Sequence, residues 1–142
     1  MGEFMHIKIN KLSKHTGAEV FGVNLKSISD EDIIHELKKA FSNHSVLVLR
    51  EQNLSPNEFY KSAKLFGKIF KQHNNKFALK ENNLVHYISN KDKFEDGKIY
   101  IPGDGYHTDH SNDLNPPKAT ILHAKSLPSY GGDTQFVNMH LV

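Results

Sequence analysis

The sequence has 142 residues, a formal net charge of +2 and no cysteine. This length fits a single domain, 1–142, and the lack of cysteine excludes disulfide scaffolds and thiolate zinc sites. The 18 basic residues are scattered among 16 acidic ones, which argues against nucleic acid or an anionic membrane as a partner. No apolar run approaches the roughly 20 residues that cross a bilayer. We therefore expect a cytoplasmic domain. Because Met5 is a second methionine near the start, residues 1–4 are either a cloning remnant or the native start of the chain.

The first fifty residues predict strands on either side of one helix. Residues 6–9 and 17–25 alternate as strands do. Residues 27–44 predict a helix, with Ser29 as the N-cap and acidic side chains in its first turn. Residues 45–50 form an apolar run of strand length, which we expect to be buried on both faces. The helix carries one apolar stripe, formed by Ile33, Ile34, Leu37, Ala40 and Phe41.

The clearest local signal is a second helix that starts after Ser55. Ser55 is a natural N-cap, Pro56 suits the first helical position, and Glu58 completes a capping box. Gly67 is placed to end the helix. One face is apolar, with Phe59, Ala63 and Phe66.

The second half of the chain predicts strands separated by polar loops. Residues 71–83 are rich in lysine and asparagine and predict a loop, and residues 84–89 predict a strand. Residues 118–127 and 134–139 are two further predicted strands, joined by the turn PSYGGD. This order indicates an α+β chain whose second half begins a β sandwich or barrel.

The segment GDGYHTDHSND, residues 103–113, concentrates imidazoles and carboxylates. His107 and Asp109 flank Thr108, and alternate residues of an extended segment point to the same side, so the two side chains can converge. Imidazole and carboxylate are the ligands of the two-histidine, one-carboxylate triad, which leaves positions on iron(II) open for substrate and dioxygen. Taken alone, an H-x-D pattern is more often an ordinary polar loop.

The longer segment YHTDHSNDLNPPKATILHAKSLPSYGGDT resembles the metal-binding region of the TauD/TfdA (taurine dioxygenase) family of Fe(II)- and 2-oxoglutarate-dependent dioxygenases. The His-Thr-Asp start, the Pro-Pro before a strand and the Gly-Gly-Asp-Thr turn occur in the family's order. GAEVFGVNL and SVLVLREQNLSPNEFYKSAKLFGKI also resemble its N-terminal elements. The resemblance runs from Ile7 to Val142 and implies a double-stranded β-helix (jelly-roll, cupin-like) fold. This chain would be its incomplete N-terminal half, with helices packed on strands.

The resemblance also implies a site and a reaction. His107 and Asp109 would be two of three Fe(II) ligands, and Thr134 would hydrogen-bond a carboxylate of 2-oxoglutarate. A small organic substrate would be hydroxylated with dioxygen, while 2-oxoglutarate becomes succinate and carbon dioxide. Tyr106 and His73 match positions where the family can place substrate contacts, although a core aromatic and a plain loop histidine are the more common roles for such residues.

Three neighbouring residues have other expected roles. His110 follows the ligand pair and is expected to point away from the metal, with a solvated or second-shell role. Asp113 is expected to be a bystander. Gly103 stands where taurine-type members of the family carry an amide side chain, which argues against taurine as the substrate.

The family's second metal-binding histidine and its 2-oxoglutarate-binding arginine lie further downstream than Val142. His140 follows His107 by too few strands to supply that histidine, and Arg50 is the only arginine in the chain. The alternative is therefore a truncated or split-gene fragment of such an enzyme, inactive alone and acting at most as a binding or self-associating module. As a protein partner we expect a second copy of the chain or a complementing C-terminal chain. A structural metal site in HTDH would need four ligands and is disfavoured without cysteine.

Overall fold

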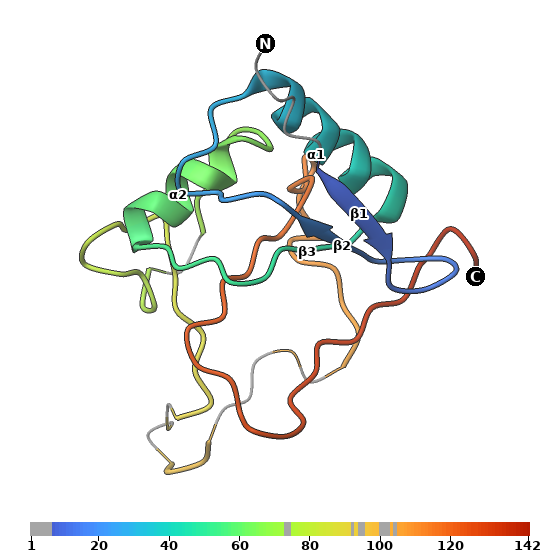
Figure 1. Ribbon diagram of the computed structural model, residues 1–142. Coiled ribbons are helices and arrows are strands. Elements are labelled where there is room, and N and C mark those ends of the chain that lie inside the picture. Colours follow the sequence, from blue (N-terminus) through green and yellow to red (C-terminus); the bar gives the residue numbers. More distant parts are fainter. Residues whose placement is uncertain (1–6, 73–74, 92, 94–95, 100–102, 104) are drawn as a thin grey trace.

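The computed structural model describes residues 7–72, 75–91, 93, 96–99, 103 and 105–142. The expectations for residues 1–4 and for His73 fall outside this range. Two helices and three strands follow the chain in a β-β-α-β-α order (Figure 1). Their bounds are β1 Lys8–Lys11, β2 Ala18–Phe21, α1 Glu31–His44, β3 Leu47–Val48 and α2 Pro56–Lys64.

The three strands form one mixed sheet in the order β1-β2-β3. β1 and β2 pair antiparallel, with Lys8 opposite Phe21 and Lys11 opposite Ala18. β2 and β3 pair in parallel, with Ala18 opposite Leu47. Parallel neighbouring strands need a crossover connection. Here α1 is that connection, because it follows β2 and returns the chain to the end of the sheet at which β2 began. The predicted strand 17–25 is thus shortened to β2.

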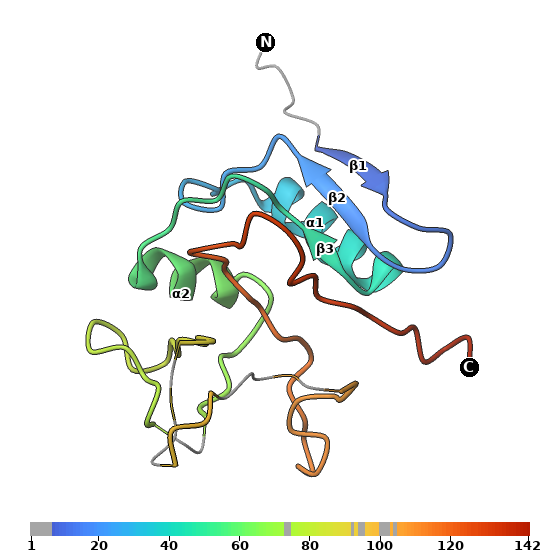
Figure 2. The ribbon, with the colours of Figure 1, turned by 90° about the horizontal axis from the view of Figure 1, so that it is seen from below.

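The core lies between α1 and the sheet. Val20 on β2 packs against Ile33 and Leu37 on α1, and all three are buried. Figure 2 shows α1 against one face of the sheet and α2 apart from it. The predicted apolar stripe of α1 is therefore confirmed where it meets β2. Neither helix of the described residues is long and apolar enough to cross a membrane.

Two details of this unit differ from the sequence expectations. Asp30, not Ser29, caps α1, because its Oδ1 accepts hydrogen bonds from the backbone N–H groups of Asp32 and Ile33 at 2.9 and 3.3 Å. The run 45–50 is paired only over Leu47–Val48, which are half-buried. It lies at an edge of the sheet, so it is not covered on both faces as expected.

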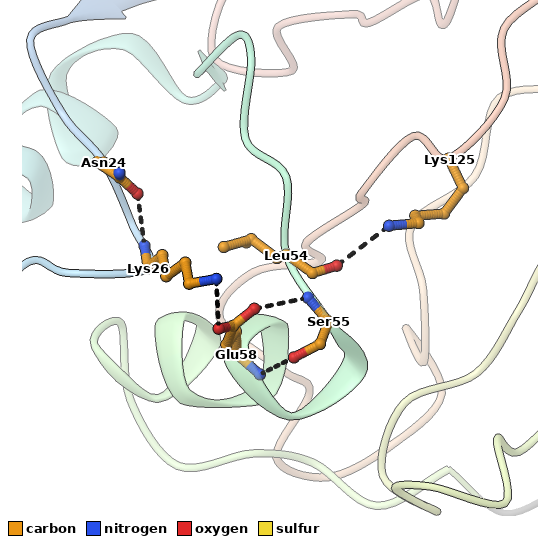
Figure 3. A network of polar contacts seen from close by, with 6 residues as sticks. All are labelled: Asn24, Lys26, Leu54, Ser55, Glu58 and Lys125. Atoms are coloured by element: carbon orange, nitrogen blue, oxygen red, sulfur yellow. Dashed lines mark hydrogen bonds and ion pairs between the residues drawn. The ribbon is translucent and has the colours of Figure 1, made fainter.

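The capping box at the start of α2 is confirmed. The Ser55 backbone N–H donates to Glu58 Oε2 at 2.8 Å, and the Glu58 backbone N–H donates to Ser55 Oγ at 3.3 Å. Lys26 Nζ lies 3.0 Å from Glu58 Oε1, which ties the loop after β2 to α2 (Figure 3). The helix ends at Lys64, three residues before Gly67.

The three strands predicted in the second half do not form within the described residues. His86, from the predicted strand 84–89, makes only an isolated bridge with Ala78. Residues 118–127 and 134–139 are traced without helix or strand (Figure 1). A strand exists only when a neighbour supplies hydrogen bonds along its length. Within the described residues, no neighbouring segment supplies such a ladder to 118–127 or to 134–139.

The last third of the chain also exposes large apolar side chains. Residues 114, 127, 130 and 142 are exposed by 76% or more, and Leu114 is fully exposed. By contrast, the core residues of α1 and β2 are at most 5% exposed. The chain is thus a packed N-terminal layer followed by extended, open segments.

The capping box predicts a pH dependence of stability. Hydrogen bonding from the Ser55 backbone N–H and contact with the Lys26 ammonium lower the pKa of Glu58 from 4.5 to about 2. Because the folded pKa lies below the unfolded one, ionised Glu58 stabilises the fold fully above pH 4.5, and this contribution is lost as the pH falls toward 2. Thermal unfolding should show wild type more stable than Glu58→Gln at pH 6, with the difference shrinking below pH 4.5.

The control for this experiment is Glu36→Gln, which removes an exposed carboxylate from α1 without touching the capping box. A gap between wild type and Glu58→Gln that stays constant from pH 6 to pH 2.5 would contradict the assignment.

Candidate metal centre

The side chains of His107 and Asp109 lie together in the second half of the chain. His107 Nε2 is 3.4 Å from Asp109 Oδ1, and the two side chains are 56% and 42% exposed. His107 Nδ1 lies 3.0 Å from the carbonyl oxygen of Gly105. Because a carbonyl only accepts, Nδ1 carries the proton in this contact, and Nε2 is the ring nitrogen that faces Asp109.

This spacing suits two ligands of one divalent ion. Ligand atoms that each lie about 2.1 Å from a metal are about 3.0 to 3.4 Å apart when they occupy neighbouring coordination positions. The separation between His107 Nε2 and Asp109 Oδ1 falls at the upper end of that range. An imidazole nitrogen and a carboxylate oxygen also form a donor pair that suits non-haem iron. The residues present therefore fit the metal that the sequence implied.

Among the described residues, no third protein ligand is gathered around this pair. Among the residues that the structure describes, no group of three His, Cys, Asp or Glu side chains is arranged to hold a metal ion. Arg50 pairs through its guanidinium with the Glu19 carboxylate on β2. The sole arginine of the chain is thus engaged in the N-terminal layer.

Gly103 shapes one side of the pair. Its φ is +86°, a left-handed conformation that favours glycine, and a Cβ built there would lie 3.9 Å from His107 Cε1. An amide side chain at this position would start from a strained backbone and lie against the imidazole ring. Gly103 therefore leaves open the space beside His107 that a longer side chain would occupy.

Asp109 has a hydrogen-bond partner that sequence reasoning missed. Thr120 Oγ1 donates to Asp109 Oδ2 at 2.6 Å, across 11 residues of chain. Each carboxylate oxygen thus faces a different group, since Oδ1 faces His107 and Oδ2 accepts from Thr120. A threonine in an apolar, strand-like run gives no local signal of such a contact.

The structure also brings the Gly-Gly-Asp-Thr turn beside the loop that carries His107 and Asp109. Tyr106 Oη donates to Gln135 Oε1 at 3.0 Å, across 29 residues of chain. Tyr106 precedes His107, and Gln135 follows Thr134, so the predicted 2-oxoglutarate-binding residue lies on a segment anchored next to the pair. The Thr134 side chain itself is exposed.

His110 is held more firmly than a solvated histidine would be. Its Nε2 lies 2.9 Å from Gln72 Oε1, its Nδ1 lies 3.3 Å from Asp113 Oδ2, and its ring centroid is 4.5 Å from that of Phe70. The side chain is 18% exposed. Asp113 contacts His110 within the same loop, and His110 joins this loop to the segment after α2.

The segment that carries Thr120 is attached to the N-terminal layer by side chains. His123 Nε2 donates to the carbonyl oxygen of Gln52 at 2.7 Å, and its ring stacks at a tilt on Phe59, with centroids 5.4 Å apart. Lys125 Nζ donates to the Leu54 carbonyl oxygen at 3.1 Å (Figure 3). The connection between β3 and α2 is therefore the platform on which this extended segment rests.

Comparison with known proteins identifies the family. Residues 8–142 match the family described as taurine catabolism dioxygenase TauD, TfdA family. The chain belongs to this family. This result confirms the resemblance seen in the sequence.

Relatives and solved structures agree. An alkylsulfatase from Acinetobacter baylyi is 29% identical over 133 residues, which cover 93% of this chain and 39% of that protein. An alpha-ketoglutarate-dependent sulfonate dioxygenase from Saccharomyces cerevisiae is 27% identical, with 93% and 33% covered. A taurine dioxygenase from Burkholderia xenovorans superposes with a TM-score of 0.64 at 29% identity, with 78% and 37% covered. The chain spans less than two fifths of each of these proteins.

The contacts of His123 with Gln52 and Phe59 predict where the chain opens locally when they are removed. His123→Ala removes one partly buried hydrogen bond and a ring contact, a loss of about 1 kcal/mol, which corresponds to roughly fivefold easier local opening. Limited trypsin digestion followed by mass spectrometry should show cleavage after Lys118 and Lys125 accelerated several-fold. The matched control is His35→Ala, an exposed histidine on α1. Equal acceleration in both variants would show that the contacts of His123 do not hold the segment.

Proposed function

We propose that this chain contributes to an Fe(II)- and 2-oxoglutarate-dependent dioxygenase that hydroxylates a small organic substrate. Family membership over residues 8–142 is the single observation that carries the proposal. The facing nitrogen and oxygen of His107 and Asp109 support it. An exposed histidine–aspartate ion pair has the same separation, so family membership carries the metal assignment. The fold that accompanies this proposal is the jelly roll, of which the chain supplies the N-terminal part.

The residues have distinct proposed roles. His107 binds the iron through Nε2. The Gly105 carbonyl oxygen accepts a hydrogen bond from His107 Nδ1–H, which leaves Nε2 as the nitrogen for the metal. Asp109 binds through Oδ1, and the Thr134 hydroxyl donates to a carboxylate of 2-oxoglutarate. When bound, iron and 2-oxoglutarate supply the oxidising chemistry, in which dioxygen is consumed, 2-oxoglutarate becomes succinate and carbon dioxide, and a substrate C–H becomes C–OH.

The substrate is proposed to be small and organic. The relatives are named as an alkylsulfatase and a sulfonate dioxygenase, so a sulfur oxyanion on the substrate is a reasonable class to test first. Gly103 disfavours taurine itself, because it supplies no amide to the substrate. Tyr106 is 68% exposed beside the metal pair and is the proposed substrate contact on this loop, together with His73 outside the described residues.

A second candidate function is binding or self-association without turnover, by a fragment that is inactive alone. Two observations favour it: no third metal-binding side chain gathers in the described residues, and Arg50 is paired with Glu19. The unpaired segments 118–127 and 134–139 offer backbone hydrogen bonds to a complementing chain or a second copy.

One experiment separates these candidates. Iron(II) and 2-oxoglutarate are added anaerobically to the purified chain, and the visible charge-transfer band of the chelate is recorded. The dioxygenase proposal expects a band in wild type and in the His35→Ala control. Asp109→Ala should weaken metal binding by more than about 100-fold, since even outer partners of a ligand contribute 10- to 100-fold. Succinate release in air would then exclude binding without turnover.

The opposite results have equally clear meanings. No band at millimolar 2-oxoglutarate would contradict activity of this chain alone and support the fragment. A band that persists unchanged in Asp109→Ala would contradict the ligand assignment.

Thr134 gives a separate prediction for the co-substrate. Thr134→Val keeps the shape of the side chain but removes the hydroxyl, and a hydrogen bond to a charged group contributes about 1.5–3 kcal/mol. We expect the apparent Kd for 2-oxoglutarate to rise by about 10- to 100-fold, while the affinity for metal alone stays the same. Titration of the chelate band measures the first, and metal titration without 2-oxoglutarate measures the second. Parallel losses in both would point to a folding defect instead.

A further inference from the structure

The carboxylate of Asp109 is held on the side away from His107. Thr120 Oγ1 donates to Oδ2 at 2.6 Å, within the range of short, charge-assisted O–H···O⁻ bonds. Oδ1 faces His107 Nε2 at 3.4 Å. With Oδ2 engaged, the carboxylate plane is fixed, and one oxygen remains to bind a metal.

Thr120 is suited to this task by its own side chain and by its position. Its branched Cβ restricts rotation about χ1, so the hydroxyl direction follows the backbone. That backbone belongs to the segment anchored three residues later, where His123 donates to the Gln52 carbonyl, and five residues later, where Lys125 donates to the Leu54 carbonyl. The position of the hydroxyl is therefore set by the N-terminal layer and not by the loop that carries Asp109.

We propose that Thr120 is a positioning residue that orients Asp109 to bind the metal through Oδ1 alone. The inference rests on the proposed function, because it assigns a role toward the iron held by His107 and Asp109. Without the hydroxyl, the exposed carboxylate is free to rotate or to be solvated on both oxygens, and it loses the orientation that the metal requires. Outer partners of this kind contribute 10- to 100-fold to metal affinity.

The test measures metal affinity directly, without turnover. Cobalt(II), an air-stable stand-in for iron(II), is titrated into the 142-residue chain, and the visible d–d band gives both the Kd and the coordination environment. Thr120→Val removes the hydroxyl at nearly constant shape, and we expect a 10- to 100-fold higher Kd with an altered band. Thr120→Ser keeps the hydroxyl, and we expect a Kd within about threefold of wild type.

The control is Ser126→Ala, which removes an exposed hydroxyl from the same segment. Its Kd should equal that of wild type. Rescue by serine separates orientation of Asp109 from simple packing, because serine restores the hydrogen bond but not the methyl group.

Each other outcome overturns a specific statement. Wild-type affinity in Thr120→Val, or equal losses in the valine and serine variants, would overturn the role of Thr120 and leave the metal pair intact. Absence of cobalt binding by wild type at millimolar metal would overturn the proposed metal pair itself, and the role of Thr120 with it.

Discussion

The arrangement of the site depends on two hydrogen bonds that attach an unpaired segment to the N-terminal layer. His123 donates to the Gln52 carbonyl and Lys125 to the Leu54 carbonyl, each across 71 residues of chain. In a sheet, the position of a segment is set by a ladder of backbone bonds. Here two side chains replace that ladder, and they place Thr120 within reach of Asp109. A donor 11 residues beyond Asp109 thereby becomes part of its surroundings.

The platform is firm because one amide side chain crosslinks it. Gln52 donates to the carbonyls of Val23 and Arg50 at 3.0 and 2.8 Å and accepts from the Leu25 N–H at 2.9 Å. These bonds join the loop after β2 to the connection after β3. The core of α1 and β2 packs behind this connection. Packing in the first third of the chain thus supports groups that lie in the last third.

The pair of His107 and Asp109, the proposed metal ligands, is open to solvent, which has a chemical consequence. Exposed ligands exchange contacts with water, so their orientation contributes little to affinity unless neighbours fix it. Gly105 fixes the His107 ring, Thr120 fixes the Asp109 carboxylate, and Tyr106 joins the loop to the segment of Thr134. Each neighbour acts on one group, and together they account for how a short loop can present nitrogen and oxygen donors at 3.4 Å.

The sequence by itself determined the features that depend on neighbours in the chain. The capping box at Ser55 and the buried stripe of α1 follow from spacing within a few residues, and the motif around His107 was enough to identify the family. Only the tertiary structure decided which extended runs become strands, because pairing requires a partner that the run does not encode. For the same reason it alone revealed the Thr120–Asp109 and Tyr106–Gln135 contacts, which cross 11 and 29 residues where no periodicity or cap links the two ends.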